Sequence, residues 1–304
     1  MKFLITGATG LIGSSILKQA IKNNNKVNYL TTRRKKLNSI PGANGFYWQP
    51  KNQEIDLRCF EEVDTIIHLS GESISKQWTK KNKKEILDSR ILSTRLLKSG
   101  IEKTLNRKIS TIICSSAIGV YPNSLEEVFN EKTKIIQNNF LQEIVIKWEK
   151  ELRKLSSLTK NLSIMRIGLV LSINGGILPR LALPVRLFIG AAFGSGKQWQ
   201  SWIHLSDLTR MFLECSENEW YGLFNAVSPN PVTQRDLLKE LGQIINRPVF
   251  LPNIPSPIIK FILGERSILV LGSQKVSCGL IIEKGFSFEY KKLDAALEDI
   301  YKKV

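Results

Sequence analysis

Apolar runs of strand length alternate with helical patterns over the first 171 residues. A short apolar run predicts a buried strand, and apolar residues that recur on one helix face predict a helix packed on it. Strands that alternate with helices indicate an α/β fold with a doubly wound, mostly parallel sheet. The strands are expected at residues 1–6, 26–32, 46–49, 64–69, 110–115 and 162–171, and helices after Gly13 and near 79–100 and 138–157.

Beyond residue 172 the pattern changes, because glycines and prolines divide the chain into short pieces. Helices are expected near 206–217, 233–246, 256–271 and 291–302. We therefore predict a nucleotide-binding core over residues 1–172 and a smaller C-terminal lobe on the substrate side over residues 173–304. Parts of residues 199–230 are expected to return to the core sheet.

The turn after the first strand contains Gly7, Gly10 and Gly13 and leads into a helix. Such a strand, glycine-rich turn and helix together suggest a dinucleotide site, in which the helix N-terminus receives the phosphates. Gly7 allows a tight turn, Gly10 lets the backbone approach a pyrophosphate, and Gly13 lets the helix pack closely. Thr9, Leu11 and Ile12 complete this predicted cofactor-binding turn. The alternative is a structural turn without a ligand.

Other candidates lie where the predicted strands end, since ligands bind outside the carboxyl ends of the strands in such sheets. These stretches are expected to converge on one crevice: Thr6-Gly7, Thr31 to Arg34, Leu69-Ser70-Gly71, Ser115-Ser116 and Leu169 to Leu171.

The end of the second strand indicates which dinucleotide binds. Enzymes that use NAD place an acidic residue there, whereas a nearby arginine accommodates the 2′-phosphate of NADP. Here the chain has Thr31, Thr32, Arg33 and Arg34 and no acid. Because arginine can bind a phosphate through two hydrogen bonds, NADP(H) is predicted over NAD(H). A solvated basic loop is the alternative.

Composition narrows the class of protein. Of the 304 residues, 42% are apolar and 23% charged, and no apolar run reaches the length of a membrane span. The four cysteines form no C-x-x-C pair, so a reducing, cytoplasmic location and no metal site are expected. The net charge of +17 raises the question of nucleic acid, with Lys80, Lys81, Lys83 and Lys84 as its densest cluster. A solvated helix face is the preferred interpretation.

Ordered motifs run through nearly the whole chain. They are Thr6-Gly7-Ala8-Thr9-Gly10-Leu11-Ile12-Gly13, His68-Leu69-Ser70-Gly71-Glu72, Glu85-Ile86-Leu87-Asp88-Ser89-Arg90, Ser116-Ala117-Ile118-Gly119-Val120-Tyr121, Trp148-Glu149, Arg166-Ile167-Gly168, Ser201-Trp202-Ile203-His204 and Asn225-Ala226-Val227-Ser228-Pro229. With these motifs the sequence resembles the atypical extended short-chain dehydrogenase/reductases of the YfcH-like type, in the NAD(P)-dependent epimerase/dehydratase superfamily.

The resemblance implies a Rossmann-type, NADP(H)-binding domain and a C-terminal lobe of unassigned role. It also implies cofactor contacts at Leu69, Ser70, Glu85, Arg90 and Val170. The residues themselves would leave Glu85 and Arg90 as ordinary helix-surface charges, since a spacing of five does not pair them on a helix.

The catalytic residues of the resembled enzymes are only partly present. Those enzymes use a serine or threonine and a Tyr-x-x-x-Lys pair, in which the tyrosine transfers a proton. Ser116 fits the serine position. Aligning Glu149 with the family's glutamate places Leu141 where tyrosine should stand and Val145 where lysine should stand. Neither side chain can move a proton.

Tyr121 and His204 are therefore the remaining candidates for proton transfer, beside Ser116. A tyrosine packed in its loop and a structural histidine are the alternatives. We predict an NADP(H)-dependent oxidoreductase or epimerase-like enzyme acting on an unidentified small molecule. The second hypothesis is a regulatory or redox-sensing protein that holds NADPH without turnover. The sequence leaves the oligomeric state open and predicts no membrane partner.

Overall fold

The computed structural model describes residues 1–104 and 108–302. The chain divides into two compact units that each comprise several segments. The first unit contains Met1–Ala117, Gln137–Arg166 and Thr209–Phe224, and the second contains Ile118–Ile136, Ile167–Leu208 and Asn225–Val304. Residue 172, the predicted boundary, lies within the second unit.

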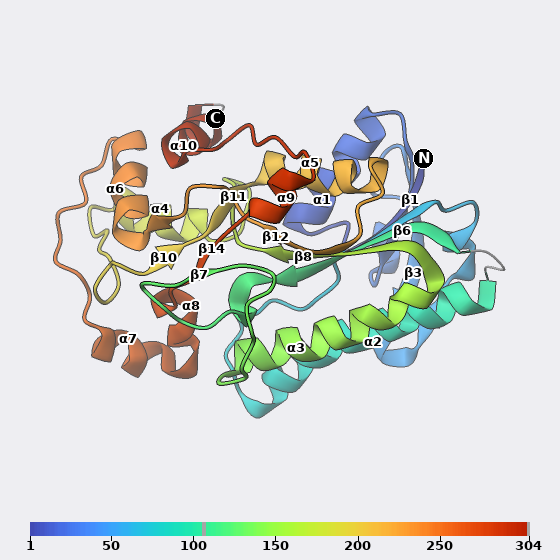
Figure 1. Cartoon of the computed structure of the whole chain (residues 1–304), viewed down its shortest axis with the longest axis horizontal. Helices are drawn as coiled ribbons and strands as arrows, with labels where there is room; N and C mark the ends of the chain where they lie inside the picture. Colours follow the sequence, from blue (N-terminus) through green and yellow to red (C-terminus); the bar gives the residue numbers. More distant parts are fainter. Residues whose placement is uncertain (105–107, 303–304) are drawn as a thin grey trace. The chain divides into compact units, whose positions relative to one another are not determined.

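An eight-stranded sheet forms the centre of the first unit, with strand order β12-β8-β6-β5-β1-β2-β3-β4 (Figure 1). The pairs β1–β2, β1–β5, β2–β3 and β5–β6 are parallel, whereas β4 pairs with β3 in the antiparallel sense. The predicted α/β class is confirmed. The strands are β1 (Lys2–Thr6), β2 (Lys26–Thr31), β3 (Ala43–Gln49), β4 (Glu54–Ile55), β5 (Thr65–His68), β6 (Ile109–Ala117), β8 (Thr159–Ile167) and β12 (Gly222–Ala226).

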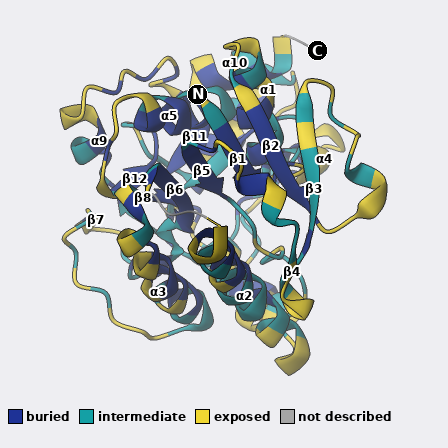
Figure 2. Cartoon of the chain, turned by 90° about the vertical axis from the view of Figure 1, so that its right-hand side faces the viewer, coloured by how far each residue is buried: buried dark blue, intermediate teal, exposed yellow. Residues whose placement is uncertain are grey.

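Helices cover both faces of this sheet. Helices α2 (Lys80–Thr104) and α3 (Phe140–Leu152) lie side by side on one face, and α1 (Leu11–Lys22) lies on the other. Figure 2 shows that α2 and α3 turn their buried sides toward the sheet. Leu96 and Leu97 of α2 and Trp148 and Leu152 of α3 join the strand residues in one apolar core. Short 3-10 turns η1 (Arg34–Lys36), η2 (Pro50–Asn52), η3 (Leu57–Phe60) and η5 (Arg153–Leu158) connect these elements.

The second unit consists of short strands and helices around its own core, in which Trp202 is fully buried. Strand β9 pairs with β11, β10 with β13, and β7 with β14. Helix α5 (Leu205–Glu217) begins in this unit and ends in the first. The other elements are η4 (Ile118–Val120), β7 (Val128–Phe129), β9 (Leu169–Leu171), α4 (Leu178–Arg186), β10 (Trp199–Gln200), β11 (Trp202–His204), β13 (Val232–Thr233), α6 (Gln234–Ile244), α7 (Ser256–Leu263), η6 (Gly264–Ser267), α8 (Ile268–Leu271), β14 (Lys275–Val276), α9 (Gly279–Glu283) and α10 (Leu293–Lys302).

Two predicted elements are divided by a glycine, so the prediction of one continuous strand and one continuous helix was wrong. The strand expected over 162–171 ends as β8 at Ile167, and a Cβ on Gly168 would stand 2.4 Å from the Ser201 carbonyl oxygen. The helix expected over 256–271 stops at Gly264, whose φ of +55° and ψ of −134° are not helical. Only glycine adopts such dihedral angles easily.

No helix in residues 1–104 and 108–302 combines the length and apolar character needed to cross a membrane.

Candidate functional site

The glycine-rich turn has the geometry that its sequence predicts. Gly7 adopts φ +68°, and the Gly10 N–H donates to the Gly7 carbonyl over 3.0 Å. A Cβ on Gly13 would stand 2.3 Å from the same carbonyl oxygen, far inside any real contact. Gly7 therefore permits the turn, and Gly13 permits helix α1 to begin directly against it.

Helix α1 presents an open N-terminus at this turn. Its N-cap is Gly10, which provides no side-chain hydrogen bond, and its first turn contains no acidic residue. The first backbone N–H groups of a helix have no acceptor within the helix, and its dipole is positive at this end. Thr9 and Gly10 are exposed, so this end of α1 can receive an anion.

The strands beside this turn end at the same edge of the sheet. Thr6 of β1 is in register with Leu30 of β2 and His68 of β5, and His68 is in register with Cys114 of β6. Residues 69–71 therefore follow β5 at the edge where Gly7 follows β1. Ser115 and Ser116 lie inside β6, which continues to Ala117.

Residues 169–171 do not end a strand of the large sheet, so that expectation was wrong. They form β9, which pairs with β11 in the second unit, because the chain leaves the sheet at Gly168. Val170 thus belongs to the second unit, whereas the other predicted cofactor-binding residues belong to the first.

The loop after β5 is held by half-buried hydrogen bonds to the end of β1. The N–H groups of Leu69 and Ser70 donate to Thr6 Oγ1 over 3.0 and 3.2 Å. A Cβ on Gly71 would stand 3.1 Å from Cζ of Arg90 on α2, so the guanidinium lies directly against this loop.

Arg90 itself is packed rather than solvated. Its guanidinium lies 5.0 Å from the centre of the Trp148 ring, and Nη1 donates to the Ile86 carbonyl over 2.8 Å. Burial lowers the Arg90 pKa to about 10. Glu85, one turn earlier on α2, is half-buried, and its carboxylate lies 3.8 Å from Lys76 Nζ.

The end of β2 is basic and exposed. The N–H of Arg33 donates to Thr31 Oγ1 over 3.2 Å, which fixes the start of η1. The Arg34 guanidinium lies 4.2 Å from the centre of the Tyr47 ring. Thr32, Arg33 and Arg34 are all exposed, so both guanidinium groups are accessible to a ligand.

Ser116 belongs to a buried charged cluster that the sequence interpretation missed. Its hydroxyl donates to Glu149 Oε1 over 2.8 Å. Arg166 binds the same carboxylate through Nε at 2.8 Å and Nη2 at 3.0 Å, and Arg153 adds a second cation at 3.0 Å. Hydrogen bonds and charge from Arg166 and the Ser116 hydroxyl outweigh burial and hold the Glu149 pKa below its usual range.

The sequence contained a signal for this cluster. Glu149 shares the buried face of α3 with Ile144, Val145, Trp148 and Leu152. A carboxylate on an apolar helix face needs a partner. The buried Arg166 of β8 provides it, and the sequence offered no means of pairing the two.

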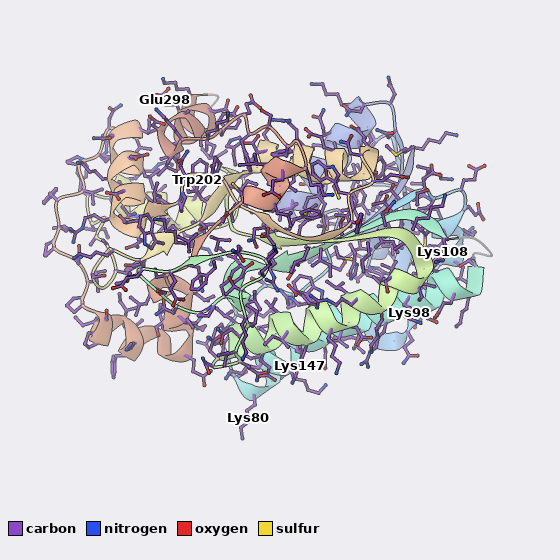
Figure 3. The ribbon with its side chains drawn as sticks, viewed as in Figure 1. Lys80, Lys98, Lys108, Lys147, Trp202 and Glu298 are labelled. Carbon is purple, nitrogen blue, oxygen red and sulfur yellow. The ribbon has the colours of Figure 1, made fainter. Side chains whose placement is uncertain are left out.

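Helix α3 places no proton-transferring side chain at the two positions aligned with tyrosine and lysine. Val145 is buried and Leu141 is half-buried. The nearest lysine in sequence, Lys147, is half-exposed on the outer side of α3 and pairs with Glu143 at 2.6 Å (Figure 3).

The other two catalytic candidates lie in the second unit. The Tyr121 hydroxyl donates to Asn225 Oδ1 over 2.8 Å, and its ring stacks on Phe129. His204 is 6% exposed, and its Nδ1 accepts the Ser206 N–H over 3.1 Å. Both side chains therefore have structural partners within their own unit.

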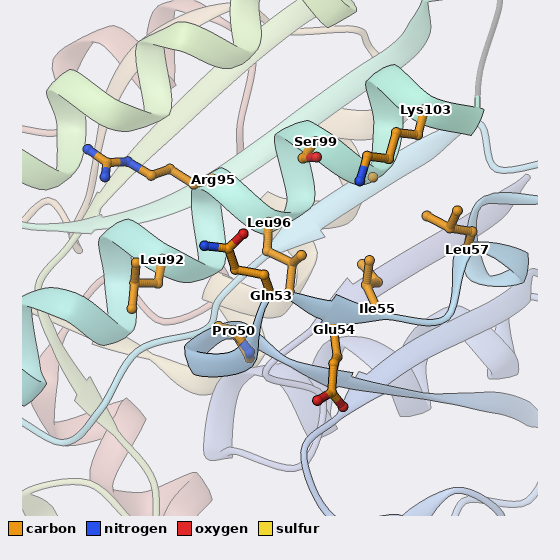
Figure 4. Close-up of a pocket in the computed structure, with 11 residues that line it drawn as sticks. Pro50, Gln53, Glu54, Ile55, Leu57, Leu92, Arg95, Leu96, Ser99 and Lys103 are labelled. Atoms are coloured by element: carbon orange, nitrogen blue, oxygen red, sulfur yellow. The ribbon is translucent and has the colours of Figure 1, made fainter.

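A pocket of about 560 Å³ lies between the β4 region and α2 in the first unit, and none of the predicted site residues lines it (Figure 4). The four cysteines, Cys59, Cys114, Cys215 and Cys278, are buried free thiols. Burial raises the pKa of each.

Comparison with known proteins identifies the family. A model described as the NAD dependent epimerase/dehydratase family matches residues 3–140, and Domain of unknown function (DUF1731) matches residues 254–300. An epimerase family protein of Staphylococcus saprophyticus is 36% identical over 301 residues, which cover 98% of either chain. The chain belongs to the epimerase family. This confirms the resemblance stated from the motifs.

Solved structures support the same family. This chain matches the crystal structure of a human epimerase family protein with NADPH. The sequence identity is 27% and the TM-score 0.88, over the full length of both chains. A nucleoside-diphosphate sugar epimerase from Corynebacterium glutamicum matches with 26% identity and a TM-score of 0.78, over 99% of this chain and 58% of that one. The epimerase-family chain is thus a nucleotide-binding protein related to short-chain dehydrogenase/reductases.

Proposed function

We propose that the chain binds NADP(H) at the carboxyl ends of β1, β2 and β5 and acts as an oxidoreductase or epimerase-like enzyme on a small molecule. The observation that carries this proposal is the pairing of an open helix N-terminus with a basic, acid-free end of β2. The human family member crystallised with NADPH supports the choice of dinucleotide.

The described residues fit such a cofactor. The backbone of residues 9–13 would hold the pyrophosphate, because the first N–H groups of α1 have no acceptor within the helix and the Gly10 N-cap adds no side chain there. Arg33 and Arg34, with Thr32, would hold the 2′-phosphate. Residues 69–71, Glu85 and Arg90 would complete the site, with Ser115 as a further proposed contact. When bound, the nicotinamide supplies or accepts a hydride.

The proton that accompanies hydride transfer must come from a group other than the family's tyrosine, because Leu141 stands at that position. Ser116 directs its proton to a carboxylate that its arginine partners keep ionised, so the serine can serve a substrate only as a hydrogen-bond acceptor. Tyr121 and His204 remain the proposed proton carriers. A second function, retention of NADPH without turnover, is favoured by the apolar Leu141 and Val145 on α3.

Replacing Arg33 and Arg34 together with alanine should weaken NADPH binding by roughly tenfold to a hundredfold, since two charge-assisted contacts to phosphate are lost. NADH binding should change by less than about twofold. Fluorescence titration with both nucleotides measures the two effects. Lys35→Ala serves as the control, because it removes a neighbouring exposed charge. Equal losses for NADPH and NADH would contradict the NADP assignment.

Turnover separates the two proposed functions. The purified protein would be titrated with NADPH and NADH and then incubated with NADPH and a panel of small carbonyl compounds, while NADPH absorbance is followed over hours. Tight binding with substrate-dependent loss of absorbance supports the enzyme. Tight binding without that loss favours the NADPH-holding protein, and absence of binding to either nucleotide refutes both.

A further inference from the structure

A chain of hydrogen bonds, buried at its centre, runs in the first unit from the loop after β5 to helix α2. It starts at Thr6 Oγ1, which accepts the N–H groups of Leu69 and Ser70. The same oxygen lies 2.8 Å from Nδ1 of His68. A hydroxyl has two acceptor positions and one proton, so Thr6 donates its proton to Nδ1.

The tautomer of His68 follows from this geometry. With Nδ1 acting as an acceptor, the ring proton is on Nε2, which lies 3.1 Å from Thr94 Oγ1. Thr94 in turn donates to the Arg90 carbonyl over 2.7 Å. Every donor in the chain meets an acceptor, and bonds aligned in this way strengthen one another.

The last residue of this hydrogen-bond chain, Arg90, contacts the same loop at which the hydrogen-bond chain begins. Arg90, whose carbonyl receives the last hydrogen bond, places its guanidinium against Gly71. Residues 69 and 70 are thus held through Thr6 on one side, and residue 71 meets Arg90 on the other. His68, which is fully buried, is the link between the two.

We infer that His68 is a positioning residue for the nucleotide site, which holds the loop of residues 69–71 and Arg90 in the arrangement that the dinucleotide requires. This inference rests on the proposed function, because it takes that loop and Arg90 to be nucleotide contacts. His68 acts through Thr6 and Thr94 and touches no ligand itself.

Protonation of His68 would break the chain at one defined point. A proton on Nδ1 would face the proton of Thr6, so the hydrogen bond between them would be lost. Strand β1 offers only the neutral Thr6, and β6 offers Cys114, whose thiol burial keeps protonated. Burial lowers the His68 pKa to about 4, which keeps the ring neutral near pH 7. The ratio of the NADPH affinity of the wild type to that of His68→Leu should therefore be constant near neutral pH and fall as the pH approaches 4.

The test compares NADPH dissociation constants, measured by fluorescence titration, for the wild type and four variants. His68→Leu removes both bonds of the ring and should weaken binding by roughly tenfold or more. His68→Asn keeps an oxygen that can accept from Thr6, so its loss should be smaller. Thr94→Val removes the hydroxyl that pairs with His68 Nε2 and leaves the bond between Thr6 and Nδ1 in place. It should weaken binding by roughly threefold to tenfold.

Thr65→Val is the matched control. Thr65 lies on the same strand as His68, and its buried hydroxyl pairs with that of Ser216 at 3.0 Å, outside the chain. Its dissociation constant should stay within about twofold of the wild type although it also loses a buried hydrogen bond. Circular dichroism checks that each variant is folded, and Thr94→Val decides the question should His68→Leu fail to fold.

The inference would be overturned if all variants bound NADPH with the dissociation constant of the wild type, or if Thr65→Val lost as much affinity as the His68 and Thr94 variants. Nitrogen NMR of the His68 imidazole provides a test that needs no cofactor. A protonated Nε2 and an unprotonated Nδ1 are expected, and the opposite tautomer would contradict the hydrogen-bond directions on which the inference rests. Failure of the wild type itself to bind NADPH would instead refute the proposed function, so the two failures are distinguishable.

Discussion

Replacing Arg166 with leucine is expected to lower the free energy of unfolding by about 3 kcal/mol, because it leaves the carboxylate of Glu149 buried without its main partner. Glu149 and Arg166 have side chains that are 4% and 5% exposed, and they share two hydrogen bonds. Arg153 still contacts the carboxylate, which keeps the loss at the lower end for a broken buried pair. Urea unfolding at pH 7 measures the effect.

The matched control is Arg95→Leu. Arg95 of α2 pairs with Glu151, which lies on α3 as Glu149 does. The side chain of Arg95 is 58% exposed, however. Its removal should cost about 1 kcal/mol or less, as for other solvated pairs. Similar losses in the two variants would show that burial does not set the strength of the Glu149 pair.

The difference between Arg166→Leu and the wild type should also depend on pH. In the wild type the Glu149 pKa is lowered from 4.5, so its stabilising effect is present above pH 4.5 and is lost as the pH falls through the folded pKa. In the variant, burial without Arg166 raises that pKa, so protonation relieves the penalty. The stability gap should therefore be full at pH 7 and narrow as the pH falls toward 4.

Gly13→Ala is expected to damage both stability and nucleotide binding. The new Cβ would stand 2.3 Å from the Gly7 carbonyl oxygen and 2.8 Å from the Gly7 carbonyl carbon. Backbone cannot move aside cheaply, so α1 must shift away from the turn, at a cost of about 1–3 kcal/mol. NADPH binding should weaken by roughly tenfold or more, because the phosphate site is built from these two segments.

Gly10→Ala separates the two effects. Gly10 has φ −83° and ψ 173°, which any residue can adopt, and a Cβ there would stand 3.3 Å from the Gly7 carbonyl oxygen. Stability should therefore change by less than about 1 kcal/mol. NADPH binding should still weaken, because a methyl group would occupy the exposed position where the pyrophosphate approaches. Unchanged binding in Gly10→Ala would place the phosphates elsewhere.

The fold was largely predictable because its first half obeys local rules. Strands β1, β2, β5 and β6 are short and mostly buried, with apolar residues at most of their positions, and the glycine-rich turn between β1 and α1 needs the conformational freedom of Gly7. Errors arose where long-range packing decides. Gly168 looked like part of a strand, but the space beside it belongs to Ser201, more than thirty residues later.

The cofactor candidates of the first unit could be predicted as a group because parallel strands bring their carboxyl ends together. Pairings between distant segments could not. Nothing local links Glu149 to Arg166, or His68 to both Thr6 and Thr94, since each pair depends on which helix crosses which strand. Whether the predicted residues bind or catalyse stays a prediction for the experiments above.

The buried cysteines restrict how the chain could respond to the redox state of its surroundings. Oxidants and alkylating reagents attack exposed thiolates, whereas all four thiols here are buried and held in the protonated form. Under the proposed function, a redox signal would reach the chain through the ratio of reduced to oxidised nicotinamide dinucleotide. The folded chain should keep its function in peroxide concentrations that inactivate proteins regulated through surface thiols.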